Sequence, residues 1–348
     1  MVYTPDRRSE GPGVDSQRGG NLNDEFKFPF LVCVCVFLSC CFTCCLTSGL
    51  RVYNVDPLVE KAHYSKEELG EVSLCEMVFR TNWLLVVRAR RPCSLMLLDD
   101  QQRAFRAEVL FKSPIRALRA RRDKVAVVLT SSVQVLALPS LGRVALLRTP
   151  AAARPLCALA TDPGAPQLLA ALAHRRGSLQ LLDVSRAVKG AQSSSPAVVG
   201  CHQTELVCLS LSANGAKLAT ASERGTIIRI WDTGSKQMVH ELRRGSDYAD
   251  VYCISFNLSG SLVCCVSDKG TLHVWTARAR GAARSHVCAC AAPAAARRAL
   301  CAFSDDTSAV VICEDGTFHK FTFSAEGSCH RSDFEYFLQV GDDDEFLH

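Results

Sequence analysis

The chain has 348 residues, of which 48% are hydrophobic and 7% aromatic, and its formal net charge is +5. Such a length is enough to bury a large core. The charge is too mild, and the aromatic residues are too few, for the basic stripe with stacking rings that nucleic-acid binding requires; an anionic membrane surface suits this balance better.

The chain begins with a polar segment, residues 1–27, whose composition predicts a disordered tail. An uncharged apolar run from Phe28 to Cys41 follows. As a helix, residues 28–46 would be about long enough to span a bilayer, so a membrane anchor is one alternative. The run is rich in Val and Cys, however, and we expect Phe28–Leu38 to act as a makeshift β-strand instead.

Short runs of Val, Leu and Ile, bounded by Gly, Ser, Asp and Pro, recur along the rest of the chain and predict an all-β protein. The clearest are Lys124–Leu129, Val133–Leu138, Gln167–Ala171, Leu179–Val184 and Ala309–Cys313. Only Ser65–Leu69 and Asp333–Leu338 are expected to form one or two helical turns. We expect one β domain over residues 28–340 and an acidic tail over residues 341–348.

Two near-copies of one pattern stand out, Thr220–Thr233 and Cys265–Trp275. Each contains a Ser, a charged pair, Gly-Thr and then alternating apolar residues that end on Trp. This pattern is typical of a propeller blade, in which a tight turn at Gly225 or Gly270 joins two strands. Between the copies lies the sequence Leu242-Arg243-Arg244-Gly245.

The arginine pair has the chemistry of a phosphate site. Adjacent residues on an extended segment point to opposite sides, so Arg243 and Arg244 can each serve a different pocket, and guanidinium groups bind phosphate oxygens bidentately. Gly245 would allow a close backbone approach. Further donors and positive charges in the two copies are Thr220, Ser222, Thr226, Arg229, Ser267, Lys269, Thr271 and His273. A solvated surface pair is the alternative.

These segments resemble the PROPPINs, the phosphoinositide-binding β-propellers of autophagy, whose hallmark is a Phe- or Leu-Arg-Arg-Gly motif between blades five and six. The resemblance extends to Cys41–Lys61, Arg121–Leu129 and Gly177–Val184, and resumes at EDGTFHKFTFSAEGSCHR. Asn-Val-Asp-Pro-Leu, Phe-His-Lys-Phe and the Asp-rich ending are most similar to the fourth member of the human-type set.

The resemblance implies a WD40-like propeller of seven four-stranded blades with two phosphoinositide sites on one edge. Matching positions assign the first site to Thr220, Ser222, Gly225, Thr226, Arg229 and Arg243, with His202 as a weaker addition. They assign the second site to Arg244, Gly245, Ser267, Thr271 and His273.

The implied ligands are membranes that carry phosphatidylinositol 3-phosphate and 3,5-bisphosphate. The implied role is that of a monomeric cytoplasmic scaffold without cofactors. It would act peripherally on phagophore, autophagosome and endosomal membranes and recruit a rod-like lipid-transfer protein. A generic WD-repeat scaffold whose lipid sites have decayed is a further alternative.

Three stretches depart from the family pattern. The polar first strand of blade one is missing, so we expect an incomplete or replaced strand there. Thr276–Arg298, where the family has a membrane-entering loop, is short and rich in Ala and Arg. Val86–Asp100 lacks a Gly-rich turn, and a local alteration of blade two is expected.

The nineteen cysteines are scattered through strand-like runs, where Cys behaves as a small buried hydrophobe. No spacing is typical of a zinc site, and the sequence predicts neither a metal site nor a disulfide framework. It contains no Gly-rich phosphate loop, nucleophile elbow or convincing carboxylate pair either, so an enzyme is not expected.

Overall fold

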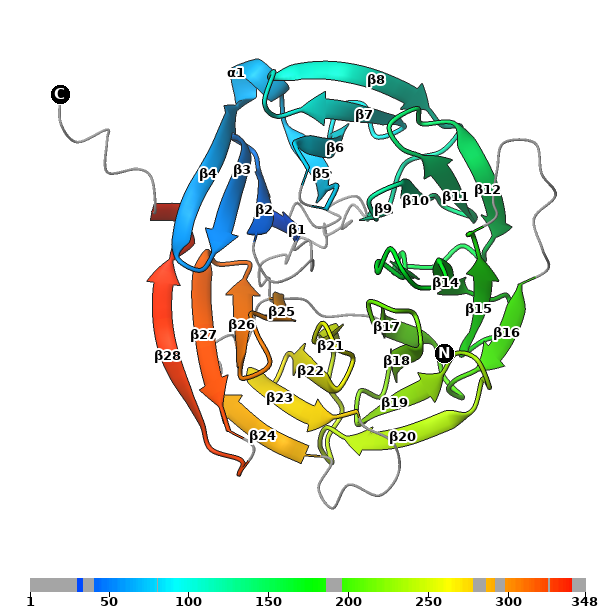
Figure 1. Ribbon diagram of the computed structural model, residues 1–348, viewed down its shortest axis with the longest axis vertical. Helices are drawn as coiled ribbons and strands as arrows, with labels where there is room; N and C mark the ends of the chain where they lie inside the picture. The colour runs from blue at the N-terminus through cyan, green and yellow to red at the C-terminus, as the bar shows by residue number, and fades with distance from the viewer. Residues whose placement is uncertain are drawn as a thin grey trace, which may run out of the picture.

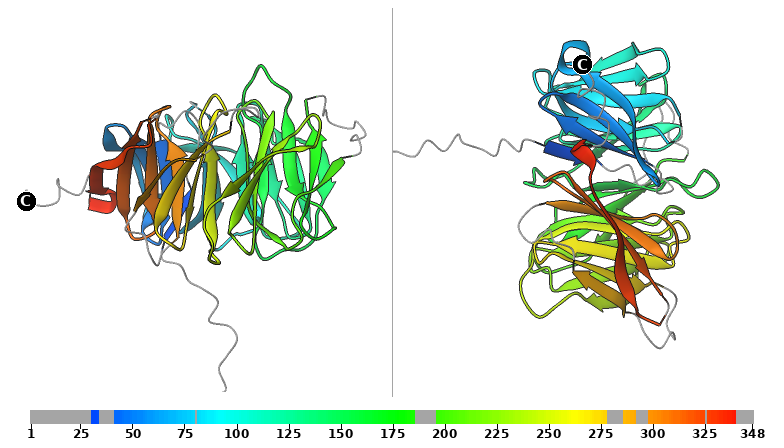
Figure 2. Two further views of the ribbon diagram at one scale, coloured as in Figure 1. Left: turned by 90° about the horizontal axis from the view of Figure 1, so that it is seen from below. Right: turned by 90° about the vertical axis from the view of Figure 1, so that its left-hand side faces the viewer.

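Seven separate four-stranded antiparallel sheets surround a central axis in the computed structural model of the chain, so the protein is a seven-bladed β-propeller (Figure 1). In each blade the strands follow one another in chain order from the axis to the rim. Figure 2 shows the ring from two sides, as a flattened body. The structure describes residues 30–33, 41–79, 81–185, 196–277, 286–291, 298–324 and 326–339.

The first four blades are formed by sixteen consecutive strands: β1 (Phe30–Cys33), β2 (Cys41–Leu46), β3 (Gly49–Val55), β4 (Leu58–Ser65), β5 (Val72–Met77), β6 (Trp83–Arg88), β7 (Ser94–Asp99), β8 (Ala104–Leu110), β9 (Ala117–Ala120), β10 (Lys124–Val128), β11 (Ser132–Ala137), β12 (Arg143–Arg148), β13 (Cys157–Leu159), β14 (Leu168–Leu172), β15 (Ser178–Asp183) and β16 (Ala197–Gly200). Blades five to seven comprise β17 (Leu206–Leu211), β18 (Lys217–Ser222), β19 (Ile227–Asp232), β20 (Met238–Arg243), β21 (Val251–Phe256), β22 (Leu262–Ser267), β23 (Thr271–Thr276), β24 (His286–Ala291), β25 (Ala299–Phe303), β26 (Ser308–Cys313), β27 (Thr317–Phe323) and β28 (Cys329–Tyr336).

The strand predictions are confirmed to within one or two residues at β10, β11, β14, β15 and β26. The predicted turn at Ser65–Leu69 is the helix α1 (Lys66–Leu69), which begins at a capping box between Ser65 and Glu68. The second predicted turn is only partly helical, because β28 continues to Tyr336 before the 3₁₀ turn η1 (Phe337–Gln339).

Blade one contains four strands, which corrects the expectation of an incomplete first blade and confirms a strand within Phe28–Leu38, where β1 lies. β1 pairs antiparallel with β2, with Phe30 opposite Leu46 and Cys33 opposite Thr43. The end of the stretch 28–46, Cys41–Leu46, is β2, an interior strand of this sheet, rather than part of a helix. In the described part of the chain, no helix is long and apolar enough to cross a membrane. The predicted tails, residues 1–27 and 341–348, lie outside the described residues.

The strand pairing corrects two other expected departures from the family pattern. In blade two, β6 and β7 pair regularly across the turn at residues 89–93, so the Arg-rich sequence does not alter the blade. In blade six, part of the stretch taken as a loop, Thr276–Arg298, is the outer strand β24, which pairs with β23. Residues 278–285 and 292–297 of that stretch lie outside the described residues.

The core consists of seven apolar clusters, one at each interface between neighbouring blades. Blades one and seven share no strand, so side-chain contacts close the ring: an apolar cluster, and an ion pair between Lys320 and Asp56 at 2.7 Å. The Phe337 ring lies 5.2 Å from the Phe42 ring and 5.4 Å from the Tyr53 ring, measured between centroids. Burying each of these rings stabilises the closed ring by roughly 2–3 kcal/mol.

One disulfide corrects the cysteine prediction. Cys290 of β24 is bonded to Cys329 of β28, and these residues are 39 positions apart. No local spacing signals this pair, because it depends on the outer strands of two blades running side by side.

Candidate functional site

The arginine doublet lies where blade five passes into blade six. Arg243 is the last residue of β20 and is exposed, whereas Arg244 is only 8% exposed. The backbone N–H of Arg244 donates to the Thr226 carbonyl at 2.9 Å, which holds the doublet against the Gly225-Thr226 turn. The predicted divergence of the two side chains is confirmed, because one faces solvent and the other is buried.

The surroundings of Arg243 form the first candidate site. Across the β19–β20 ladder Arg229 is directly opposite Glu241, and Ile227 is opposite Arg243, so all four side chains share one face. The Arg229 Nε lies 3.0 Å from the Glu241 Oε2, and its Nη1 donates to the Cys201 carbonyl at 2.8 Å. Arg229 and Thr226 are half-buried. The site therefore carries two guanidinium groups and one carboxylate.

Glu241 is the residue of this site that the sequence analysis missed. Its spacing of two from Arg243 on a strand is the signal that would have placed it on the same face. Because the carboxylate pairs with Arg229, it occupies donors that would otherwise be available to an anion.

Thr220 does not reach the surface. It has no exposed area, its Oγ1 accepts the Trp231 Nε1–H at 3.0 Å, and the His202 Nε2 lies 3.0 Å away on its other side. Burial and the Arg229 charge lower the pKa of the His202 imidazole to about 4, so the ring is neutral at pH 7. Thr220 and His202 thus support the strand that holds Arg229, and Ser222 is also largely buried, at 7% exposed.

The turn at Gly225 requires glycine. Its φ is +62°, and a Cβ atom there would lie 1.8 Å from the Ala249 carbonyl oxygen. That close approach brings the segment before β21 against the turn of blade five. At Gly245, by contrast, a Cβ atom would meet nothing within 4 Å among the described residues, so packing against them does not demand glycine.

Arg244 fixes this arrangement and forms part of the second candidate site. Its Nε donates to the Gly225 carbonyl at 2.6 Å, and its Nη2 donates to the Asp247 carbonyl at 2.6 Å. These charge-assisted bonds join the turn of blade five to the loop that enters blade six. Arg244 therefore has a structural role besides any contact with a ligand.

His273 lies close enough to Arg244 for the guanidinium charge to act on it. Its ring stacks on Trp275 with centroids 5.3 Å apart. Burial lowers the pKa of the His273 imidazole to about 4, and the charges of Arg244 and His286 act in the same direction. Its Nδ1 is buried and has no hydrogen-bond partner in the described part of the chain. The Arg244 charge therefore acts on the His273 ring.

The remaining predicted residues of the second site differ in exposure. Ser267 is 1% exposed, and its hydroxyl accepts the backbone N–H of Lys269 at 3.4 Å. Thr271 is half-buried, with its Oγ1 3.5 Å from the Lys269 carbonyl. The Lys269 ammonium pairs with Asp268 at 3.1 Å. Thr271 and Lys269 are therefore more available to a ligand than Ser267.

Comparison with known proteins identifies relatives of this chain. The family model described as PROPPIN matches residues 31–294. The chain is 33% identical over 240 residues to SVP1-like protein 2 of Pichia angusta, a match covering 68% of this chain and 66% of that protein. It is 30% identical over 240 residues to Autophagy-related protein 21 of the same organism, covering 66% and 61%. The chain thus spans about two thirds or less of the length of these relatives.

Solved structures of similar fold include Hsv2 of Kluyveromyces lactis with its complete loop 6CD. That structure has a TM-score of 0.75 and 18% identity, and the match covers 86% of this chain and 96% of that chain. A second is the complex of KlAtg21 with the coiled-coil of AgAtg16, with a TM-score of 0.73 and 23% identity, covering 88% and 98%. These likenesses support the seven-bladed fold.

Proposed function

The chain belongs to the PROPPIN family, and on that premise we propose that it is a phosphoinositide-binding β-propeller that acts as a scaffold in autophagosome formation. Its ligands are the headgroups of phosphatidylinositol 3-phosphate and 3,5-bisphosphate. No reaction is part of this role. Within the family, the motifs at Asn54–Leu58 and Phe318–Phe321 favour the fourth member of the human-type set.

The observation that carries the proposal is the divergence of Arg243 and Arg244 at the boundary between blades five and six. The guanidinium of Arg243 opens to solvent on the same face as Arg229, and that of Arg244 is buried, with its charge acting on His273. Two arginine-centred sites on neighbouring blades, each with further polar side chains around it, can each hold a phosphorylated headgroup. Two weak sites that act on one membrane raise its affinity far above that of either site alone.

Vesicle flotation tests the lipid part of the proposal. Vesicles of phosphatidylcholine should be compared with the same vesicles containing about 5% phosphatidylinositol 3-phosphate or, at equal charge, phosphatidylinositol 4-phosphate. We expect co-flotation with the 3-phosphate and several-fold less with the 4-phosphate. Equal binding to both would favour the alternative of a WD-repeat scaffold with decayed lipid sites.

The partner part of the proposal concerns a second surface, a groove of about 1090 Å³ between β8 and β12 on the rim of blades two and three. Leu110 is 66% exposed and Leu146 is 40% exposed at this groove. Lys112, Arg143 and Arg148 add positive charge around them. An amphipathic helix with an acidic edge from a lipid-transfer protein fits this chemistry. The related complex of KlAtg21 contains a coiled-coil partner, which supports a helical ligand.

Co-sedimentation of the purified chain with a recombinant lipid-transfer protein tests the groove. We expect Leu110→Asp to reduce binding at least tenfold, and Val198→Asp, at an exposed position on β16, to leave it unchanged. Binding that survives Leu110→Asp would place the partner elsewhere. The proposed location is the cytoplasm, with peripheral attachment to phagophore, autophagosome and endosomal membranes, and the proposed state is a monomer.

A further inference from the structure

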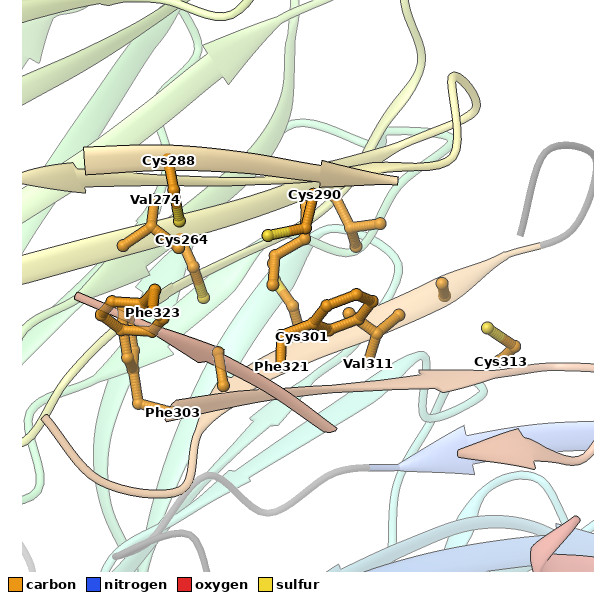
Figure 3. Packing of buried hydrophobic residues seen from close by; sticks show 14 residues of the cluster. Cys264, Val274, Cys288, Cys290, Cys301, Phe303, Val311, Cys313, Phe321 and Phe323 are labelled. Carbon is orange, nitrogen blue, oxygen red and sulfur yellow. The ribbon is translucent and has the colours of Figure 1, made fainter. Parts of the chain in front are cut away.

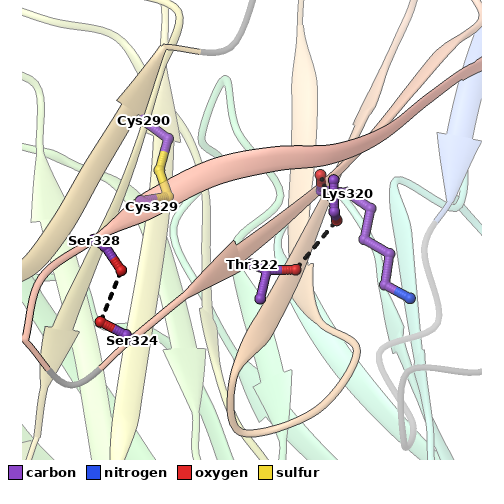
Figure 4. Close-up of a disulfide and its surroundings, with 7 residues drawn as sticks. Cys290, Lys320, Thr322, Ser324, Ser328 and Cys329 are labelled. Atoms are coloured by element: carbon purple, nitrogen blue, oxygen red, sulfur yellow. Dashed lines mark hydrogen bonds between the residues drawn. A yellow bond between two sulfur atoms is a disulfide. The ribbon is translucent and has the colours of Figure 1, made fainter.

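Three sulfur atoms meet at the rim between blades six and seven, away from the arginine doublet. Cys290 of β24 is bonded to Cys329 of β28, with their Cα atoms 6.2 Å apart (Figure 4). The sulfur of Cys288, two residues before Cys290, lies within 4.8 Å of both. These strands belong to different sheets, so the bond joins two blades that share no backbone ladder.

The inner side of this group is apolar. Cys288 and Cys290 are 3% and 7% exposed, and they belong to the cluster between blades six and seven together with Val274, Phe303 and Phe321 (Figure 3). Cys329, at the start of β28, is half-buried. A reagent in solution therefore reaches this group through Cys329.

We propose that Cys290 and Cys329 are a reversible oxidation site, at which a small-molecule disulfide of the glutathione class links blades six and seven. The Cys329 thiolate attacks one sulfur of the oxidant, which releases one thiolate and leaves a mixed disulfide on Cys329. The Cys290 thiolate then attacks the Cys329 sulfur and releases the second thiolate. Two protein thiols are oxidised and lose two protons, while one small-molecule disulfide is reduced to two thiols.

The accessibility of Cys329 makes the bond reversible, because excess thiol can attack the same sulfur and run both steps backwards. Exposed disulfides are the labile ones, whereas buried structural bonds resist reduction. Cys288 is an alternative partner for Cys329, because its sulfur also lies within 4.8 Å of the Cys329 sulfur. Its burial raises the pKa of the thiol to about 11, so it is mainly protonated at neutral pH and competes weakly with Cys290.

The bond closes a loop of 39 residues that contains β25, β26 and β27 of blade seven. Closing a loop of this length restricts the unfolded chain, which corresponds to a rise of about 5 °C in Tm for a domain of this size. Oxidation should therefore stiffen the boundary between blades six and seven and leave the other six boundaries unchanged.

Peptide mapping of the full chain tests the proposal directly. After incubation in oxidised or reduced glutathione, alkylation and trypsin digestion, Cys329 lies on the peptide 321–331, and Cys288 and Cys290 lie on the peptide 285–297. We expect the two peptides to be linked in oxidised glutathione, with Cys288 alkylated, and separate in reduced glutathione. The Tm should be about 5 °C higher in the oxidised sample.

Variants add specificity to the same assay. Cys329→Ser should abolish both the link and the Tm difference, Cys290→Ser should move the link to Cys288, and Cys93→Ser in blade two should change neither. The linked peptide and the Tm difference of the wild-type chain test the proposal even if a variant fails to fold. Absence of the linked peptide in oxidised glutathione, or a Tm independent of the glutathione state, would overturn the proposal. So would one equivalent of bound metal that is lost on Cys288→Ser, since the three thiols would then be ligands.

Discussion

Around Arg243 the surface is open, and the neighbouring Arg229 is held by a partly exposed carboxylate, Glu241. Around Arg244 the guanidinium is buried and donates to two backbone carbonyls, those of Gly225 and Asp247. Adjacent residues of one type thus have different physical roles. At Arg243 the charge is free to bind a ligand, whereas at Arg244 the same charge also joins two blades, so substitutions at the two positions should have different costs.

A second comparison, between three blades, concerns the place of the first candidate site. Gly-Thr turns occur in blades five, six and seven, and the residue after each turn is Ile227, Leu272 or Phe318. The partners of these residues on the outer strands are Arg243, Cys290 and Glu335, respectively. The Gly-Thr turn by itself therefore does not make an anion site. Of these three copies, only that of blade five has an arginine opposite the residue that follows the turn.

Loss of both arginines should have the largest effect. Arg243→Thr together with Arg244→Thr should lower binding to vesicles containing phosphatidylinositol 3-phosphate by at least 100-fold, because each site loses charge-assisted bonds worth roughly 1.5–3 kcal/mol. Each single variant should retain one site and lose only the avidity of two. Arg122→Thr, at an exposed position on the β9–β10 turn, is the matched control. Full binding by a folded double variant would contradict the two-site account.

The two arginines should also differ in how much each contributes to the stability of the folded protein. Arg244→Thr leaves the buried Gly225 carbonyl and the partly buried Asp247 carbonyl without their donor, which costs about 3 kcal/mol and lowers Tm by about 5 °C. Arg243→Thr should change Tm by less than about 1 °C, since its side chain is exposed. Differential scanning calorimetry without ligand decides this, and equal Tm values for the two variants would remove the structural role of Arg244.

Much of this boundary could be predicted from sequence. The repeated Gly-Thr turns, the closing Trp residues and the Arg doublet identified the blades and the boundary at which the candidate sites are proposed. Burial of Thr220 by His202 and Trp231 could not be predicted, because it depends on a segment 18 residues away in the chain. The strand β1 lies within the expected Phe28–Leu38, but its register against β2 could not be predicted, since a run that is apolar on both faces does not specify one.

Substitution of Glu241 should have a moderate effect on headgroup binding at the first site. Glu241→Gln removes a carboxylate that pairs with Arg229 in a partly exposed position, so the first site should bind a headgroup about three-fold more tightly, the change expected for a surface ion pair. The measurement is titration of soluble inositol 1,3-bisphosphate into Glu241→Gln in an Arg244→Thr background. Glu108→Gln, which breaks an ion pair with Arg91 in blade two, is the control. Weaker binding by the Glu241 variant would mean that the carboxylate positions Arg229 productively.

His273 should make the second site dependent on pH. In the free protein the pKa of His273 is lowered to about 4, so the ring is neutral at pH 7. A phosphate beside it would favour the charged form, and binding would then take up a proton, so affinity should rise as pH falls from 7 toward 5. The test compares Arg243→Thr with Arg243→Thr/His273→Gln, since protonation of the phosphate affects both equally. Parallel pH profiles would exclude His273 as a ligand.

In the ligand-free protein the lowered pKa of His273 has the opposite effect, because it makes the folded state less stable at low pH. Between pH 6.5 and about 4 the unfolded chain binds a proton at His273 that the folded chain does not, so stability falls as the pH is lowered through this range. Thermal midpoints should therefore decline less steeply with acidification in His273→Gln than in the wild-type chain. Identical slopes would show that the ring is not buried as described.

The central claim is that neighbouring arginines serve two separate anion sites, and binding stoichiometry tests it most directly. Isothermal titration calorimetry with soluble inositol 1,3-bisphosphate should give two headgroups per wild-type chain, one for Arg243→Thr, one for Arg244→Thr and none for the double variant. A stoichiometry of one in the wild-type chain that both single variants abolish would mean that the two arginines bind a single phosphate together, and would contradict the account.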